Sequence, residues 1–292
     1  MSFGFSLEQP WGVNRGGGLT IPYKMLTGHD VADFRGGGGV TPLSTLREVL
    51  ISCSRGGGVI FGGQFLMRRY VEKPRGGGNI SRIHNIFLSL GSAIRGGGMV
   101  QEVLPIIVNH GLYHGGGGTT AWTQRLEVLY YINYRGGGYE LLDTVLLVLK
   151  KKPLGGGGYY HHSMTLSLCF FQLQGGGGVS WAPIILNLFV HIIMWGGGFL
   201  SSFGIRPWWK KHLTWGGGTQ FVIDIGIIYF CTYNWGGGAY YPSLPNMGTC
   251  AGTERGGGFG CFSISSYLLL FVQFWGGGYQ NKVASSKKLK SQ

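Results

Sequence analysis

Seven apolar segments dominate this chain of 292 residues, and each approaches the roughly 20 residues that a helix needs to cross a bilayer. Inside a bilayer every backbone polar group must be bonded within the protein, which restricts spanning segments to helices or closed barrels. Apolar runs of this length favour helices. We therefore predict an all-α polytopic membrane protein, a bundle of seven transmembrane helices. The segments cover residues 49–67, 86–108, 139–149, 159–173, 179–200, 213–233 and 259–274.

A Gly-Gly-Gly triplet interrupts most of these segments. It recurs every twenty residues, fourteen times from 16–18 to 276–278, while the sequence between the triplets does not repeat, so the chain is no solenoid. The residue before each triplet is always Arg, Trp or Gly, the three residues whose codons end in two G bases. Our hypothesis is that the period belongs to the coding DNA and that runs of G have replaced the original bases. Genuine glycine codons of mixed third base would contradict it.

The composition is informative only after these blocks, meaning each triplet and the residue before it, are set aside. They contain seven of the 24 basic residues, so the formal net charge falls from +13 to +6. So small a surplus gives no reason to expect nucleic-acid binding. The blocks also hold 45 of the 58 glycines, so the glycine content indicates neither disorder nor collagen.

The remaining basic residues alternate between the two sides of the predicted bundle. Fourteen follow the first, third, fifth and seventh segments, and only three, Lys24, Arg47 and Arg125, fall on the other side. Cytosolic loops carry the excess of Lys and Arg, so the N-terminus is predicted outside the cytosol and the C-terminus within it. The fourteen are Arg68, Arg69, Lys73, Arg82, Lys150, Lys151, Lys152, Arg206, Lys210, Lys211, Lys282, Lys287, Lys288 and Lys290.

This topology divides the chain into three parts. Residues 1–43 form a polar, turn-rich, non-cytosolic segment without a cleavable signal peptide, residues 44–280 the seven-helix domain, and residues 281–292 a cytosolic basic tail. Lys288 and Lys290 in the tail resemble a dilysine retrieval signal for the endoplasmic reticulum. The alternative is a solvated tail that follows the charge rule. The Asn79-Ile80-Ser81 glycosylation acceptor is predicted to face the cytosol and stay unmodified.

The third segment carries two acidic residues. Glu140 and Asp143 are three residues apart, which places them on one face of a helix that is otherwise apolar. Carboxylates inside a bilayer are costly and usually have a function. The run Lys150, Lys151 and Lys152 then ends the segment.

Polar residues recur in the next three segments. His161 and His162 open the fourth, His191 lies in the fifth, and Thr214 and Gln220 lie in the sixth. Intramembrane polar groups normally face a bundle interior or cavity, which favours a functional reading of the histidines over isolated core histidines. For Thr214 and Gln220 a bridge between helices is an equal alternative.

At these residues the chain resembles the ELO family of very-long-chain fatty acid elongases. Residues 140–144 resemble the family's K-x-x-E-x-x-D-T, with Gly137 in place of the lysine, and residues 158–162 resemble H-x-x-H-H, with Gly158 in place of the first histidine. Residues 191–198 resemble H-x-x-M-Y-x-Y-Y without its tyrosines, and residues 214–220 resemble T-x-x-Q-x-x-Q without its central glutamine. Every departure is a block position.

The resemblance implies a seven-helix 3-ketoacyl-CoA synthase of the endoplasmic reticulum membrane. Such an enzyme condenses acyl-CoA with malonyl-CoA, releases carbon dioxide and CoA, and works beside the other fatty-acid elongation enzymes in the bilayer. No metal or cofactor is implied. The chain as it stands is expected to be impaired because its motifs are incomplete.

The resemblance also suggests roles for the residues. His161 or His162 would hold the acyl group as nucleophile or act as base, and we favour His162. His191 and Gln220 are candidate donors to the enolate that decarboxylation generates. Asp143 and Glu140 would orient the histidines. Basic residues such as Lys150, Lys151 and Lys152 suit the phosphates of CoA, as binding groups together with Thr214 and Gln220.

Two other readings stay open. A di-iron membrane desaturase or hydroxylase also contains H-x-x-H-H, but it needs about eight histidines in three boxes by analogy with those enzymes, and five of the eight here are scattered singly. A non-enzymatic seven-helix transporter would leave the clustered histidines unexplained. Iron analysis tests the first, and a malonyl-CoA-dependent product would exclude the second.

Overall fold

The computed structural model describes residues 23–25, 30–34, 36, 41–72, 78–118, 122–151, 156–248 and 250–275. Within these ranges the chain is all-α, as predicted, and has no strand. Two short 3₁₀ helices, η1 (Val31–Asp33) and η3 (Trp208–Lys211), accompany the long helices. The long helices are α2 (Leu46–Tyr70), α3 (Gly78–Gly117), α4 (Gln124–Leu149), α5 (Gly156–Gly175), α6 (Trp181–Ser201), α7 (Leu213–Tyr240) and α8 (Glu254–Phe274).

Each of the seven predicted segments corresponds to one long helix, and all but 179–200, which begins two residues before α6, lie wholly within it. The largest difference concerns α4, which begins at Gln124 rather than just before residue 139. Residues 126–134 are mostly apolar, and the triplet at 136–138 does not interrupt the helix, because glycine lowers helix stability without removing a backbone hydrogen bond. The tail at 281–292 and most of the segment at 1–43 lie outside the described residues.

Threonine N-caps fix the start of three helices. The Thr45 hydroxyl accepts a hydrogen bond from the Glu48 backbone N–H (3.3 Å) in a capping box that begins α2. Thr123 and Thr253 accept equivalent bonds, each 3.2 Å long, at the starts of α4 and α8. Each cap satisfies one of the N–H groups that the first turn leaves without a partner, so these starts are encoded locally.

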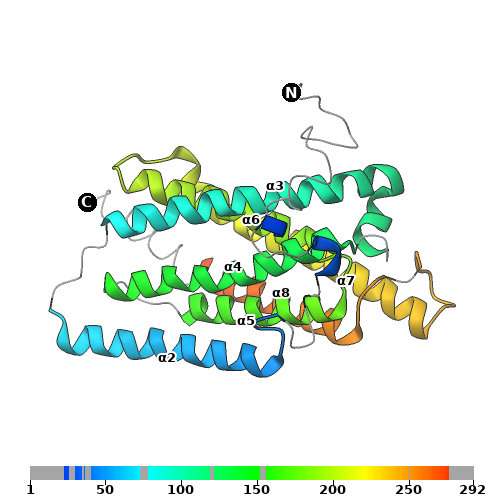
Figure 1. Ribbon diagram of the computed structural model, residues 1–292, viewed down its shortest axis with the longest axis horizontal. Coiled ribbons are helices and arrows are strands. Elements are labelled where there is room, and N and C mark those ends of the chain that lie inside the picture. Colours follow the sequence, from blue (N-terminus) through cyan, green and yellow to red (C-terminus); the bar gives the residue numbers. More distant parts are fainter. Residues whose placement is uncertain are drawn as a thin grey trace, which may run out of the picture.

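Six of the long helices form a closed ring. In spatial order α3 packs on α4, α4 on α5, α5 on α8, α8 on α7, α7 on α6, and α6 returns to α3. The seventh, α2, lies outside the ring along α4 and α5, at the lower edge of Figure 1. Val49 of α2 packs there with Tyr134, Leu166 and Phe170. The ring therefore has an interior bounded by several helices.

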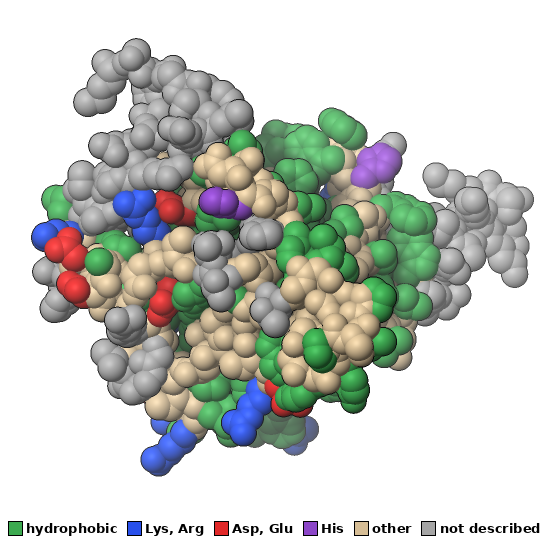
Figure 2. All heavy atoms as spheres, turned by 90° about the vertical axis from the view of Figure 1, so that its right-hand side faces the viewer, with side chains coloured by type: hydrophobic (Ala, Val, Ile, Leu, Met, Phe, Trp, Pro, Cys, Tyr) green, Lys and Arg blue, Asp and Glu red, His purple; other side chains and the backbone are tan. Residues whose placement is uncertain are grey.

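The outer surface is strongly apolar. On α3 the residues Ile83, Phe87, Leu90 and Ile94 form one stripe at helical spacing, and their exposed fractions lie between 56% and 76%. Hydrophobic side chains also reach the surface at many places on the end shown in Figure 2. Continuous exposed apolar surface of this kind marks contact with a membrane or a partner.

The prediction of seven membrane spans is not confirmed. Among the described residues, two helices are long and apolar enough to cross a membrane, at Trp181–Ser201 and Glu254–Gln273. The blocks explain part of the shortfall, because they put at least three glycines into every long helix and an arginine into four of them, including Arg95 in α3. Glycine and arginine both lower the mean hydropathy of a helix. Helices with exposed apolar stripes are therefore no longer apolar enough along their length to be recognised as membrane spans.

Basic residues from several loops meet at one end of the bundle. Lys150, at the end of α4, donates a hydrogen bond to Ser81 of α3 (2.5 Å), and Arg82 donates to the Ser202 carbonyl after α6 (2.9 Å). These contacts bring together loops that the charge count assigned to the same side. Which side of a membrane this end faces stays a prediction.

The topology predicts which asparagine is glycosylated. An acceptor engineered near residue 5 should be modified in the endoplasmic reticulum, and Asn79, at the basic end beside Arg82, should not be. The measurement is a gel shift that is reversed by a glycosidase. Modification of Asn79 would contradict the assignment.

Candidate functional site

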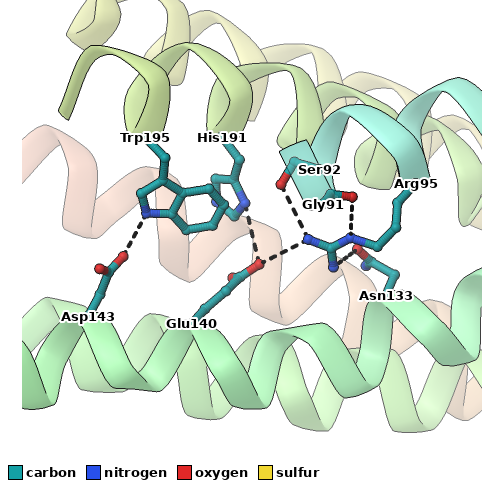
Figure 3. A network of polar contacts seen from close by, with 8 residues as sticks. All are labelled: Gly91, Ser92, Arg95, Asn133, Glu140, Asp143, His191 and Trp195. Atoms are coloured by element: carbon teal, nitrogen blue, oxygen red, sulfur yellow. Dashed lines mark hydrogen bonds and ion pairs between the residues drawn. The ribbon is translucent and has the colours of Figure 1, made fainter. Parts of the chain in front are cut away.

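The acid pair of α4 faces the neighbouring helix α3 and, across the ring, α6, as Figure 3 shows. Glu140 is buried, with 6% of its surface exposed, whereas the Asp143 side chain is 30% exposed. Their spacing of three residues gives them a common direction on the helix. The sequence prediction of a shared face is therefore confirmed.

Glu140 lies between two cationic or polar partners. Its Oε1 is 3.5 Å from Nδ1 of His191 on α6 and 3.8 Å from a guanidinium nitrogen of Arg95 on α3. Arg95 also donates to Asn133 (3.1 Å) and Ser92 (3.2 Å), which anchors its guanidinium (Figure 3). A buried carboxylate is tolerated only with such compensation, and Arg95 is a block residue.

Asp143 uses both carboxylate oxygens. Oδ2 accepts a hydrogen bond from the indole N–H of Trp195 (2.6 Å), and Oδ1 is 2.9 Å from Nε2 of His84 on α3. Trp195 is a block residue, whereas His84 is not. Sequence reasoning missed His84, because its only signal is a single histidine just before an apolar segment, far along the chain from Asp143.

The paired histidines of α5 point in different directions. Their ring centroids are 5.6 Å apart, and the ring planes are inclined by 87°. Successive residues leave a helix in directions about 100° apart. The ring of His161 packs on Tyr267 of α8 (4.7 Å between centroids) and lines a cavity. Both histidines interact electrostatically with Glu140 and His191, and His162 interacts with Asp143 as well. Of the two, His161 lines the cavity, and both lie close to the network of Glu140 and His191.

The cavity inside the ring has a volume of about 250 Å³. Its walls come from α4 to α8, and side chains such as Leu168, Phe221, Ile228 and Ile264 make it largely apolar. Gln220 and Asp224 of α7 add polar groups, and the Gln220 amide donates to Asp224 Oδ2 (3.3 Å). An apolar pocket with a few polar groups is typical of a site for an amphipathic ligand.

The loop after α7 contributes the far end of the cavity. Cys250 lies there against Cys231 of α7. A hydrogen bond from the Cys231 thiol lowers the pKa of the Cys250 thiol, although burial acts in the opposite direction. The lining of the cavity therefore includes His161 of α5 as well as loop residues near position 250.

The other predicted residues are placed less centrally. Thr214 does not line the cavity, although Gln220, on the same helix, does. Lys150 is bonded to Ser81, and Lys151 donates to the Glu72 carbonyl (3.4 Å), so neither lysine pairs with a carboxylate there. Lys152 lies outside the described residues. In the part of the chain that the structure describes, no three His, Cys, Asp or Glu side chains are grouped as metal ligands would be.

Comparison with protein families gives a match over most of the chain. The model of the GNS1/SUR4 (ELO) family matches residues 44–287. The chain belongs to the ELO family. A comparison with curated proteins gave no match. Family membership supports a role in fatty-acid elongation, and together with the apolar helices it indicates an integral membrane protein.

The ELO motifs are incomplete at block positions, and the structure shows how much room each position has. A Cβ atom at Gly137 or Gly158 would meet no atom within 4 Å, and one at Gly217 would touch Phe271 at 3.9 Å. A Cβ atom at Gly198 would lie 2.9 Å from the Asn85 side chain, which would have to move. At three of these four positions the first carbon of a side chain therefore meets no obstacle.

We predict that His84 stabilises this ELO protein through Asp143. His84→Gln should lower the free energy of unfolding by about 1 to 2 kcal/mol, a small loss because Asp143 is partly exposed. The measurement is thermal denaturation in detergent. His110→Gln, an exposed position on the same helix, is the matched control and should have little effect. Equal stability of the two variants would contradict the prediction.

Proposed function

We propose that this ELO protein is a very-long-chain 3-ketoacyl-CoA synthase of the endoplasmic reticulum membrane. It condenses acyl-CoA with malonyl-CoA and releases carbon dioxide and CoA. The observation that carries the proposal is the apolar cavity with His161 and Gln220 in its wall, next to the network of Glu140 and His191.

The acyl chain occupies the cavity, since its walls are mainly apolar and burial of methylene groups stabilises binding. His161 lies in the cavity wall, whereas His162 does not line the cavity and interacts with both carboxylates of the acid pair. Sequence reasoning favoured His162 as nucleophile or base, whereas the geometry favours His161 for contact with the acyl group. In this arrangement His162 is the histidine that the carboxylates orient and charge-balance.

Malonyl-CoA supplies the carbon nucleophile when it loses carbon dioxide. The enolate oxygen needs hydrogen-bond donors at its position, and His191 and Gln220 fill this role. Glu140 contacts Nδ1 of His191, so this carboxylate sets the orientation of the imidazole.

The basic end binds the CoA phosphates. Lys150 and Lys151 contact only uncharged groups among the described residues, so their positive charges are available to a ligand. Lys152 adds a third charge from the sequence. Lysine binds phosphate as a point charge, so the affinity for CoA should fall as the salt concentration rises.

The direct test is an assay of microsomes that express the gene with its block positions restored to the ELO motif residues. Malonyl-CoA and acyl-CoAs of graded length should give 3-ketoacyl-CoA, with one preferred range of chain length. No malonyl-CoA-dependent product would contradict the proposal, and stoichiometric iron in such a preparation would point to a di-iron enzyme.

We predict that the chain with its blocks is inactive. Gly158 offers no imidazole, Gly137 no ammonium, and Gly198 no phenol hydroxyl, so three motifs lack groups that the reaction needs. Gly158→His alone should not restore activity, although a Cβ atom at this position meets no other atom within 4 Å. Malonyl-CoA-dependent elongation by the unrepaired chain would show that the essential residues lie elsewhere.

We predict different consequences for the two adjacent histidines in the restored chain. His161→Ala should abolish formation of a covalent acyl-enzyme, because it removes the imidazole that faces the cavity. His162→Ala should reduce turnover by about 100-fold or more but leave the acyl adduct detectable by mass spectrometry. An adduct that survives in His161→Ala and disappears in His162→Ala would reverse the two roles.

A further inference from the structure

Asp224 is a buried acid that the proposed condensation does not use. It lies on α7 one turn after Gln220, only 1% of its surface is exposed, and it lines the cavity. Oδ2 accepts a long hydrogen bond from Gln220 (3.3 Å), and Oδ1 has no hydrogen-bond partner among the described residues. No described Lys, Arg or His forms an ion pair with it, in contrast to Glu140, which faces both Arg95 and His191.

Burial of Asp224 Oδ1 without a hydrogen bond costs free energy. A buried polar atom without a hydrogen bond loses its interactions with water and gains nothing in return. Phe221 and Ile228, on either side of Asp224 along α7, line the same cavity and offer no polar group. A ligand or a water molecule in the cavity can supply the hydrogen bond that this oxygen lacks.

The position along α7 limits which part of a ligand can reach this oxygen. Four residues of helix separate Asp224 from Gln220, a rise of about 6 Å. If the thioester lies beside Gln220, as the proposed function requires, Asp224 faces the acyl chain a few carbon atoms further on. An unsubstituted chain carries only methylene groups there and leaves the oxygen unsatisfied.

We propose that Asp224 forms a polar subsite that binds a hydroxyl group on the acyl chain, so that hydroxylated acyl chains are preferred over plain ones. This inference rests on the proposed function, because it takes the cavity as the acyl site. A hydroxyl both donates and accepts a hydrogen bond, so it satisfies the free oxygen of Asp224 whatever its protonation state. Sites built to bond a substrate hydroxyl discriminate strongly against analogues that lack it.

The test measures binding to the purified chain in detergent. Stearic acid and a set of monohydroxystearic acids, with the hydroxyl moved along the chain, compete with a fluorescent fatty acid. One hydroxyl position should bind about tenfold or more tightly than stearic acid. Ile228→Trp, which fills the cavity, should abolish displacement and so separate cavity binding from partition into detergent.

Two variants and a control assign the preference to Asp224. Asp224→Leu should remove the advantage of the hydroxyl without weakening stearic acid binding, and Asp224→Asn should keep part of it, because the amide still forms hydrogen bonds. Ser263→Ala is the control, since Ser263 is also fully buried with an unpartnered hydroxyl among the described residues but does not line the cavity. This variant should keep the full preference.

Three outcomes would overturn the inference, and they differ in what else they affect. Equal binding of all the acids, or an unchanged preference in Asp224→Leu, would refute the hydroxyl subsite and leave the acyl cavity intact. Tighter binding of a long-chain amine than of any hydroxy acid would make Asp224 a counter-ion for a cation instead. If Ile228→Trp abolishes none of the observed binding, the fatty acids do not bind in the cavity. That result would refute the cavity as an acyl site and the proposed function with it.

Discussion

The contact between Glu140 and His191 is the interaction on which the site depends. A carboxylate in the interior of an apolar bundle is stable only with a partner, and His191 of α6 provides one at 3.5 Å. The contact joins α4 to α6 across the ring, although these two helices are not adjacent in the order in which the ring helices pack. Neither residue belongs to a block, so this part of the network does not depend on the origin of the glycine triplets.

Other contacts of the same network do depend on it. Arg95 and Trp195 are block residues, yet one supplies a cation to Glu140 and the other an N–H to Asp143. If the blocks replace original residues, these two partners are substitutes. The ELO pattern would put a tyrosine in place of Trp195 and a lysine in place of Gly137, one turn before Glu140 on α4. The contacts of His84 and His191 with the acid pair would then be the lasting part of the network.

The sequence predicted the helices and the acid pair well, because apolar runs and a spacing of three residues are local signals. It could not predict the order of helices in the ring, the meeting of His84 with Asp143, or the isolation of Asp224, since these arise from residues far apart in the chain. Nor could it show that His161 and His162 face different surroundings, which follows from how α5 is rotated against α4 and α8. The seven spans remain unconfirmed because the glycines that interrupt the apolar segments also lower their hydropathy.

The central claim is that an acyl chain lies inside the helical ring. The most direct measurement is photolabelling with a diazirine-bearing acyl-CoA, followed by mass spectrometry of the labelled peptides, with and without excess unlabelled acyl-CoA. The account predicts competable labels on cavity residues such as Leu168, Ile228 and Ile264, whereas labels on the outward-facing Phe65 of α2 should resist competition. Competable labels confined to the outer surface, with none on α5, α7 or α8 inside the ring, would contradict it.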